Sequence, residues 1–161
     1  MPEQDSDQNG DDQVAAWRAL LLAQNAVLRA IDEELVAAQA VPLHVYDVLL
    51  ELNAAPERRL RIKELAARTV LTRSRISRLV DELVTANLVE RVPDQADRRG
   101  SLAALTPAGR DALKAAAPVY LAGISRHFTA HLNADEIPVI VAALSRVVQA
   151  HQPLITIRSR R

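Results

Sequence analysis

Apolar residues recur at three- and four-residue intervals along almost the whole chain, and this spacing is the strongest constraint on its fold. Between residues 14 and 38 the aliphatic positions follow the helical period over a segment too long for a strand. Similar patterns occur at residues 43–52, 62–68, 73–86, 107–132 and 137–148. Aromatic residues make up only 2% of the chain, so its core must consist of Leu, Val, Ile and Ala. The sequence therefore predicts helices that pack on helices.

The helical period is interrupted once, by two short β-prone runs, Leu88–Val92 and Ser101–Leu105. The polar stretch Pro93–Gly100 lies between them, which predicts a two-stranded hairpin with a long charged tip. Two short helices precede the hairpin, and longer helices flank the whole unit. The predicted fold class is therefore mainly α with a small β-hairpin wing: a winged helix-turn-helix lobe plus a helical dimerisation region formed by the N- and C-terminal helices.

The C-terminal third of the chain reads as two helices. Thr106 followed by Pro107 is a cap with proline at the first helical position. The helix that starts there is expected to reach about Leu132, with a kink at Pro118. A last helix follows, and its predicted inward-facing residues are Ile137, Ile140, Leu144, Val147 and Val148.

Composition excludes several classes of protein. The chain has no Cys, so disulfides, thiol catalysis, cysteine-based zinc sites and thiol redox sensing are excluded. No signal-peptide pattern is present, and no apolar run is expected to reach membrane-spanning length. These features predict a cytoplasmic protein without membrane contact.

The net charge of zero hides an uneven distribution of charge. From Glu57 to Arg110 there are twelve Lys or Arg and seven Asp or Glu, whereas the first thirteen residues are acidic and contain no basic residue. The predicted organisation follows from this pattern and from the helices. It comprises a disordered acidic tail (1–13), N-terminal helices for dimerisation and the start of the winged lobe (14–56), the winged helix-turn-helix lobe (57–105), C-terminal dimerisation helices (106–152) and a basic tail (153–161).

The helix predicted from Thr72 to about Ala86 separates an apolar stripe from a basic face. Thr72 is a suitable N-cap, and Asn87 follows where a left-handed residue often ends a helix. The outward and flanking positions hold Arg73, Ser74, Arg75, Ser77, Arg78 and Asp81. A helix fits the major groove of DNA, its N-terminus favours phosphate, and arginine reaches guanine edges. The ordinary alternative is a solvated charged face.

The predicted hairpin tip strengthens the nucleic-acid interpretation. Arg98 and Arg99 lie on a projecting loop just after the basic helix, and a projecting arginine fits a narrow minor groove. Asp97 is interpreted as the partner that orients Arg99. The alternative is a turn with a surface ion pair, which contributes little stability.

The long flanking helices carry more apolar surface than so small a lobe buries by itself. One interpretation is a single intramolecular bundle. The favoured one is a symmetric homodimer in which these helices pair with a second copy.

In this order of elements the chain resembles the MarR family of bacterial regulators. The resemblance covers nearly everything after residue 13, and its specific part lies between Ile62 and Gly109. An Asp-x-Arg wing (Asp97-Arg98-Arg99) followed by Leu105-Thr106-Pro107-Ala108-Gly109 is a strong joint signal. The remaining matching segments are Leu65-Ala66, Ser77-Arg78-Leu79-Val80-Asp81-Glu82-Leu83, Leu88-Val89-Glu90-Arg91 and Asp94. The chain departs from the family at Asn87, where Gly is usual.

The resemblance implies a triangular dimer whose two winged lobes contact successive major grooves of an inverted-repeat operator. It places the helix 72–86 in the major groove and the wing 93–100 in the minor groove, with Lys63 as a candidate phosphate contact. The positions that match reading residues of the helix are Arg73, Ser74, Arg75, Ser77 and Arg78; in the wing they are Arg99 and its orienting Asp97.

Many members of the family release DNA when a small molecule binds between the dimer helices and the lobe. Candidate lining residues, for each of which a packing role is the alternative, are Trp17, His44, Tyr46, Tyr120 and Phe128. No cofactor is required, and the effector is not identified by the sequence. A metal-responsive variant is also considered, because His127 and His131 are four residues apart on one predicted helix, with His44 or Asp47 as a third ligand.

Three classes of function are therefore compared. The favoured one is a sequence-specific regulator of transcription, in the sense of a repressor, located in the cytoplasm at the nucleoid. The second is a winged protein-interaction module without DNA specificity. An enzyme is the weakest interpretation, because the sequence has no phosphate-binding glycine loop, nucleophile elbow or metal-hydrolase helix motif.

Overall fold

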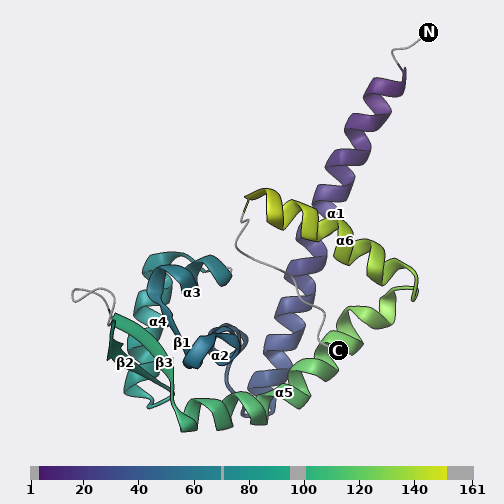
Figure 1. The fold of residues 1–161 in the computed structure, drawn as a ribbon. Helices are drawn as coiled ribbons and strands as arrows, with labels where there is room; N and C mark the ends of the chain where they lie inside the picture. Colours follow the sequence, from purple (N-terminus) through teal and green to yellow (C-terminus); the bar gives the residue numbers. More distant parts are fainter. Residues whose placement is uncertain (1–3, 70, 95–100, 152–161) are drawn as a thin grey trace.

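The computed structural model describes residues 4–69, 71–94 and 101–151, and it consists of helices around one small sheet (Figure 1). The α-helices are α1 (Gln4–Ala37), α2 (Leu43–Ala54), α3 (Ile62–Arg68), α4 (Arg73–Thr85), α5 (Pro107–His127) and α6 (Glu136–His151). The strands are β1 (Arg59–Arg61), β2 (Val89–Pro93) and β3 (Ser101–Leu105), with short 3-10 turns η1 (Pro56–Arg58) and η2 (Thr129–His131). The mainly helical fold class with a β wing is confirmed.

The sheet has three antiparallel strands in the order β1–β3–β2, so the wing is larger than the predicted two-stranded hairpin. Leu60 of β1 and Arg91 of β2 both pair with Ala103 of β3. The extra strand comprises only three residues, with only Leu60 buried. So short a run leaves no recognisable alternation in the sequence, so the spacing of apolar residues does not predict this strand.

One continuous core joins the winged lobe to the middle of the molecule. It is built mainly from aliphatic side chains of α1, α2, α3, α4, α5 and the sheet, as expected for a chain with so few aromatic residues. Fully buried members are Leu35, Val48, Leu49, Leu52, Leu65, Ile76, Val80, Ala103 and Ala116. The rings of Tyr46 and Tyr120 stack with centroids 4.2 Å apart and so attach α2 to α5.

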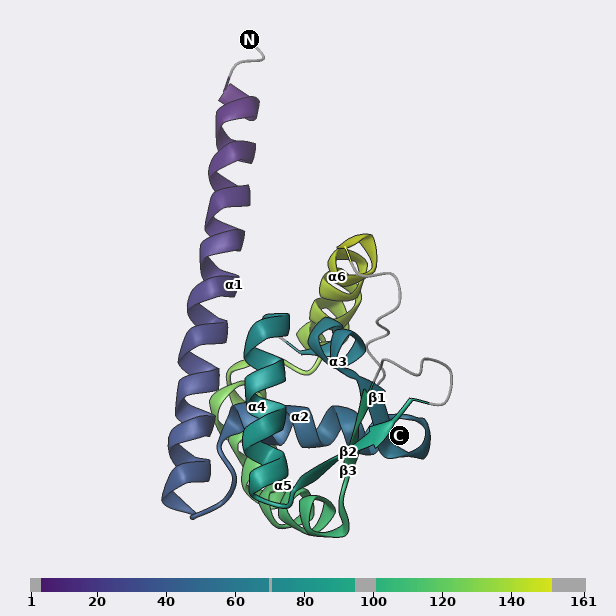
Figure 2. The ribbon, with the colours of Figure 1, turned by 90° about the vertical axis from the view of Figure 1, so that its left-hand side faces the viewer.

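Helix α1 is longer than predicted. It begins at Gln4, so most of the segment that was expected to be a disordered acidic tail is helical. No proline lies between residues 4 and 41, and adding residues to an existing helix costs far less than starting one. Figure 2 shows α1 running past the winged lobe and extending well beyond it.

The C-terminal helices differ from expectation in two ways. Helix α5 ends at His127 rather than near Leu132, because Phe128 has non-helical torsion angles (φ −126°, ψ −68°) and a 3-10 turn follows. In α6, none of the described residues is buried, although five were predicted to face inward. Ile140, Leu144 and Val148 are half-buried, whereas Ile137 and Val147 are exposed, so a single protomer covers these side chains only in part.

Large apolar side chains are exposed along α1, α5 and α6. Trp17 is 59% exposed, Leu121 62% and Val139 66%, and all three lie outside the winged lobe. The stretch Gly10–Ala37 is even long and apolar enough to cross a membrane, by length and composition only, contrary to the expectation from the sequence. Two arginines, Arg18 and Arg29, lie within it. An amphipathic interface helix passes the same test, so the finding is weak evidence for a membrane span.

The lobe joins α5 through a tight junction. The Thr106 hydroxyl accepts a hydrogen bond from the Gly109 amide (2.9 Å) and donates one to the Asn87 carbonyl (2.7 Å). Asn87 has φ 58°, so it forms the left-handed end of α4 that the sequence predicts. A Cβ added at Gly109 would lie 2.0 Å from the Leu88 carbonyl oxygen.

Gly109→Ala is therefore expected to lower the free energy of unfolding by about 1–3 kcal/mol, since the backbone must move to admit a methyl group. Gly10→Ala is the matched control, because a Cβ there meets no atom within 4 Å and alanine favours the helix. Urea unfolding followed by circular dichroism measures both. Equal stability of the two variants would contradict the tight junction.

Candidate DNA-binding interface

The basic helix α4 forms as its sequence predicts. The Thr72 side chain caps it by accepting a hydrogen bond from the Arg75 amide (3.4 Å). Its apolar stripe is buried and consists of Ile76, Leu79, Val80 and Leu83. This one-sided burial fixes the rotation of the helix about its axis and therefore decides which side chains face solvent.

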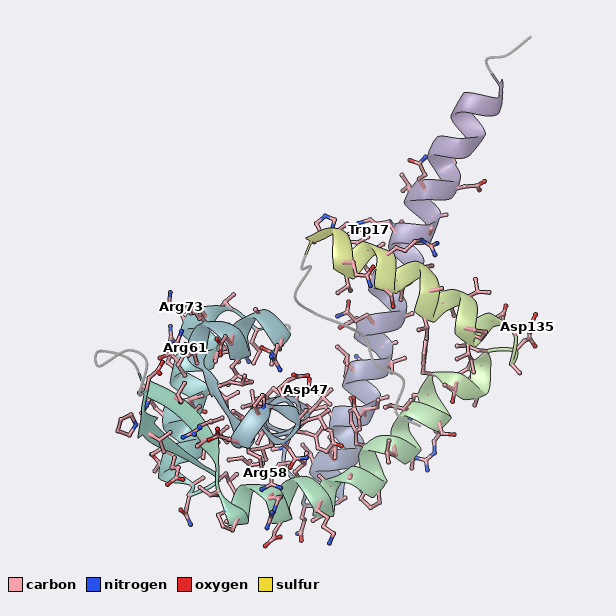
Figure 3. All side chains as sticks on the ribbon, viewed as in Figure 1. Trp17, Asp47, Arg58, Arg61, Arg73 and Asp135 are labelled. Atoms are coloured by element: carbon pink, nitrogen blue, oxygen red, sulfur yellow. The ribbon has the colours of Figure 1, made fainter. Side chains whose placement is uncertain are left out.

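The predicted reading residues of α4 lie at its exposed N-terminal end. Arg73, Ser74, Arg75 and Arg78 are exposed, and Ser77 is half-buried. The Thr72 and Ser74 hydroxyls are 3.3 Å apart. Lys63 is exposed on α3, which packs against α4. Figure 3 shows Arg73 at the same end of the lobe as the root of the wing.

A hollow of about 370 Å³ separates part of α4 from α2. Arg75 and Arg78 line it together with His44 of α2. The sequence predicts His44 as a candidate effector contact and as an alternative third metal ligand. Its position next to the arginines of α4 is a tertiary feature, since His44 and Arg75 are 31 positions apart in the sequence.

The root of the wing is held by an ion pair. Asp94, the last described residue before the tip, is only 7% exposed, and its carboxylate accepts a hydrogen bond from Arg61 Nε at 2.5 Å. The Arg61 amide in turn donates to the Glu64 carboxylate (3.1 Å) at the start of α3. Asp94 and Arg61 thus attach the end of β2 to β1 and α3. Asp97, Arg98 and Arg99 lie outside the described residues.

A second ion pair joins α4 to the sheet. The Arg91 guanidinium lies 2.7 Å from the Asp81 carboxylate and also donates to the Ser101 hydroxyl (3.1 Å). Asp81 was expected on the open face of the helix, but Arg91 of β2 engages it. Arg91 lies too far along the chain from Asp81 and from Ser101 for helical spacing to predict these contacts.

The candidate effector residues do not form one cluster. Tyr46 is buried against Tyr120, whereas Trp17 lies on α1 far from the lobe (Figure 3). Burial raises the pKa of Tyr120 to about 12, with further contributions from the charges of Asp47 and Tyr46. Burial also raises the pKa of Asp47 to about 6, helped by the negative charge of Glu51.

The structure removes the geometric basis of the metal hypothesis. His127 ends α5 and His131 lies in η2, so the two rings do not share one face of a continuous helix. His127 Nε2 instead lies 2.8 Å from the Glu34 carboxylate, which also accepts a hydrogen bond from Arg126. Among the described residues, no group of three or more His, Asp or Glu side chains is arranged to hold a metal ion.

The His127 and Arg126 contacts attach α5 to α1 near the point where the two helices approach closely. There, a Cβ at Gly123 would lie 3.0 Å from the Ile31 side chain. The hydrogen bond from His127, followed by the hydrogen bond and the positive charge of Arg126, holds the pKa of Glu34 below 4.5. The ionised Glu34 carboxylate is therefore favoured by the folded state.

Comparison with known proteins identifies the lobe. Residues 41–100 match the sequence model of the MarR family. The fold is similar to that of the MarR family regulator AbsC from Streptomyces coelicolor (28% identity, TM-score 0.77, 87% of this chain and 94% of that one). It is equally similar to Sco3205 of the same organism, solved in complex with DNA (28%, TM-score 0.79, 89% and 90%).

A more distant structure shares the fold alone. It is that of BpsR from Bordetella bronchiseptica, whose DNA binding is regulated by 6-hydroxynicotinic acid (21% identity, TM-score 0.72, 81% of this chain and 90% of that one). No curated protein sequence matches the chain.

Asp94→Asn is expected to lower the free energy of unfolding by about 1–3 kcal/mol, because the buried carboxylate loses a charged hydrogen bond from Arg61. Glu33→Gln serves as the control, since the Arg29–Glu33 pair is exposed and such pairs contribute little. Thermal unfolding measures both variants. An Asp94→Asn protein as stable as Glu33→Gln would show that the root of the wing does not depend on this pair.

The free energy of unfolding should depend on the protonation state of Glu34 at low pH. Because its pKa is lowered in the folded state, its contribution is complete above 4.5 and is lost as the pH falls through the lowered pKa. Glu34→Gln should therefore lose less stability than the wild type when the pH falls below 4.5, as measured by urea unfolding at several pH values. Parallel curves for wild type and variant would contradict the α1–α5 contact.

Proposed function

We propose that the chain is a MarR-family DNA-binding regulator of transcription and that it acts as a homodimeric repressor of an inverted-repeat operator. Members of this family regulate transcription and are not enzymes. The observation that carries the proposal is the capped helix α4, whose arginines are exposed at its N-terminal end while its apolar stripe is buried. The DNA complex of Sco3205, at 28% identity, supports duplex DNA as the partner.

The homodimer is supported by the exposed apolar side chains of α1, α5 and α6. These helices lie outside the lobe, and α6 has no buried residue within its described range. A second copy related by a two-fold axis would cover them and set two lobes side by side. Two-fold symmetry then favours an operator with half-sites about one helical turn apart.

In the proposed complex α4 enters the major groove and the wing enters the minor groove. Arg73, Arg75 and Arg78 read base edges or bind phosphates, with Thr72, Ser74 and Ser77 as shorter-range contacts. Lys63 of α3 binds phosphate. Arg98 and Arg99 of the tip, with Asp97 orienting Arg99, contact the minor groove.

A small effector is proposed to release the DNA. Support comes from the hollows that separate α2 from α4 and from α1, both of which are bordered by His44. BpsR, which shares the fold, is regulated by a small molecule. Tyr46 and Tyr120 contribute to the wall of this region by packing, and Trp17 and Phe128 remain candidates for contact in the dimer. Metal control has no comparable support.

The location proposed for a regulator of this kind is the cytoplasm, on the nucleoid. A protein-interaction module without DNA specificity would not require three arginines at the exposed N-terminus of a helix that fits the major groove. We therefore retain DNA binding as the function that the geometry supports best.

Arg75→Ala should weaken binding to the operator by about 1–3 kcal/mol and make the salt dependence less steep. Lys114→Ala on α5 is the control, because this exposed lysine lies outside the proposed interface. The measurement is fluorescence anisotropy with the DNA upstream of the protein's own gene, in a salt series with competitor DNA. The proposal is wrong if the wild type and Lys114→Ala bind duplex DNA no more tightly than Arg75→Ala does.

The protein should sediment at about twice its chain mass of 17.6 kDa. Val139→Glu on α6 should shift it toward the monomer, because a charge buried in an apolar interface is unfavourable. Val84→Glu, at an exposed apolar position of α4, is the matched control. A monomeric wild type would overturn the dimer.

A further inference from the structure

A hollow of about 520 Å³ lies between α1 and α2, and its chemistry differs from that of the basic hollow beside α4. Leu21 and Leu28 of α1 and Leu43 of α2 give it apolar walls, and Asp47 adds a carboxyl group. Figure 3 shows Asp47 on the side of α2 that faces α1. A volume of this size is typical of a site for a small organic molecule.

Asp47 stands out because its charge is not compensated. The side chain is half-buried, and within the described part of the chain it makes no hydrogen bond or ion pair with a cation. The charged group that influences it is Glu51, one turn further along α2 and of the same sign. Tyr120, from α5, approaches from the core side as a neutral phenol.

The other charged groups of the hollow have partners. The Asp32 carboxylate accepts a hydrogen bond from the Leu43 amide (2.7 Å) and so caps α2. Arg29 lies 3.6 Å from Glu33 on the exposed side of α1. Beyond the hollow, Glu51 lies 4.0 Å from Arg68 of α3. The Asp47 carboxylate is thus the group whose charge a bound molecule would balance.

We propose that the effector of this regulator is an organic cation, a protonated amine or quaternary ammonium with an apolar body, which binds in the α1–α2 hollow against Asp47. The inference rests on the proposed effector control and adds the chemical class of the ligand. The three leucines contact the apolar body of the cation. A half-buried carboxylate that forms no ion pair within the described chain favours such a ligand, because the pairing regains part of the free energy lost on desolvation.

The site also has a direct route to the DNA-reading helix. His44 borders the α1–α2 hollow and the hollow lined by Arg75 and Arg78. A ligand that displaces the His44 ring therefore acts on the surroundings of both arginines. Occupation of the hollow also changes the distance between α1 and α2, which the Asp32 cap sets. Either effect biases the position of the lobe in the dimer.

Cation binding should depend on pH in a defined direction. Because the pKa of Asp47 is about 6, its carboxylate is ionised at pH 7.5, and affinity should fall as the pH drops through that value. Asp32, Arg29 and His44 line the same hollow, and the charges of Glu51 and Tyr120 interact with that of Asp47. A substitution at Asp47 shows whether its carboxylate causes the pH dependence.

The test uses two probes of the same shape and opposite charge, tetraphenylphosphonium and tetraphenylborate, titrated into the full-length protein by calorimetry at pH 7.5 in sodium buffer. We expect the cation to bind at least about tenfold more tightly than the anion, and Asp47→Asn to remove that preference. Asp111→Asn, at an exposed acid of α5 that does not line the hollow, is the matched control and should bind the cation as the wild type does.

Asp47→Asn is suitable for this test because it should fold. The raised pKa means that ionised Asp47 lowers the stability as the pH rises from 3.8 to about 6. The variant, which lacks this charge, should be at least as stable as the wild type at pH 7.5. Its unfolding curve and sedimentation are recorded with the calorimetry.

Three results would overturn the inference: no binding of the cation, equal or tighter binding of the anion, or undiminished cation binding by Asp47→Asn. If the wild type binds no cation and Asp47→Asn shifts toward the monomer, the inference is wrong and the partner of Asp47 belongs to the second copy. Operator binding is measured separately on the ligand-free protein. Its absence counts against the proposed function, whereas its presence without cation binding counts against this inference alone.

Discussion

The burial of one face of α4 is the constraint on which the rest of the structure depends. Ile76, Leu79, Val80 and Leu83 insert into the core of the lobe, and this fixes both the rotation of the helix and the exposure of its arginines. α3 and β2 pack against the same helix. Because an apolar stripe buries only one way, the basic face needs no separate device to hold it toward solvent.

Two ion pairs made by the strands then hold the wing in position relative to that helix. Arg61 with Asp94 and Arg91 with Asp81 join the strands to α3 and α4. Hydrophobic contacts tolerate small rotations, whereas charged hydrogen bonds depend on direction as well as distance. The two pairs therefore suit the task of holding helix and wing in one geometry, which simultaneous contact with two grooves requires.

Outside the lobe the polarity of the surface reverses. α1, α5 and α6 expose apolar side chains that a second copy would cover, and the α1–α2 hollow lies where these helices meet the lobe. In such a dimer, a molecule that changes the spacing of α1 and α2 also changes the spacing of the two reading helices. His44 and Asp47, both on α2, lie where the DNA-reading lobe meets the helices that are proposed to form the dimer.

The sequence by itself determined the elements whose signals are local. The α2, α3 and α4 bounds, the caps at Thr72 and Thr106, and the left-handed Asn87 follow from spacing and from side chains that bond to nearby backbone. The basic face of α4 follows from the same period. These predictions succeeded because each depends on residues within one or two turns of one another.

Only the tertiary structure decided the third strand, the Asp94–Arg61 and Asp81–Arg91 pairs, the His127–Glu34 contact and the placement of Asp47 in a hollow. Each joins residues that are distant in the chain, and the pattern within one segment carries no information about which other segment will pack against it. The end of α5 at His127 and the exposure of α6 have the same origin. At both places the helical spacing of apolar residues continues in the sequence, but a single protomer does not supply the contacts that would bury them.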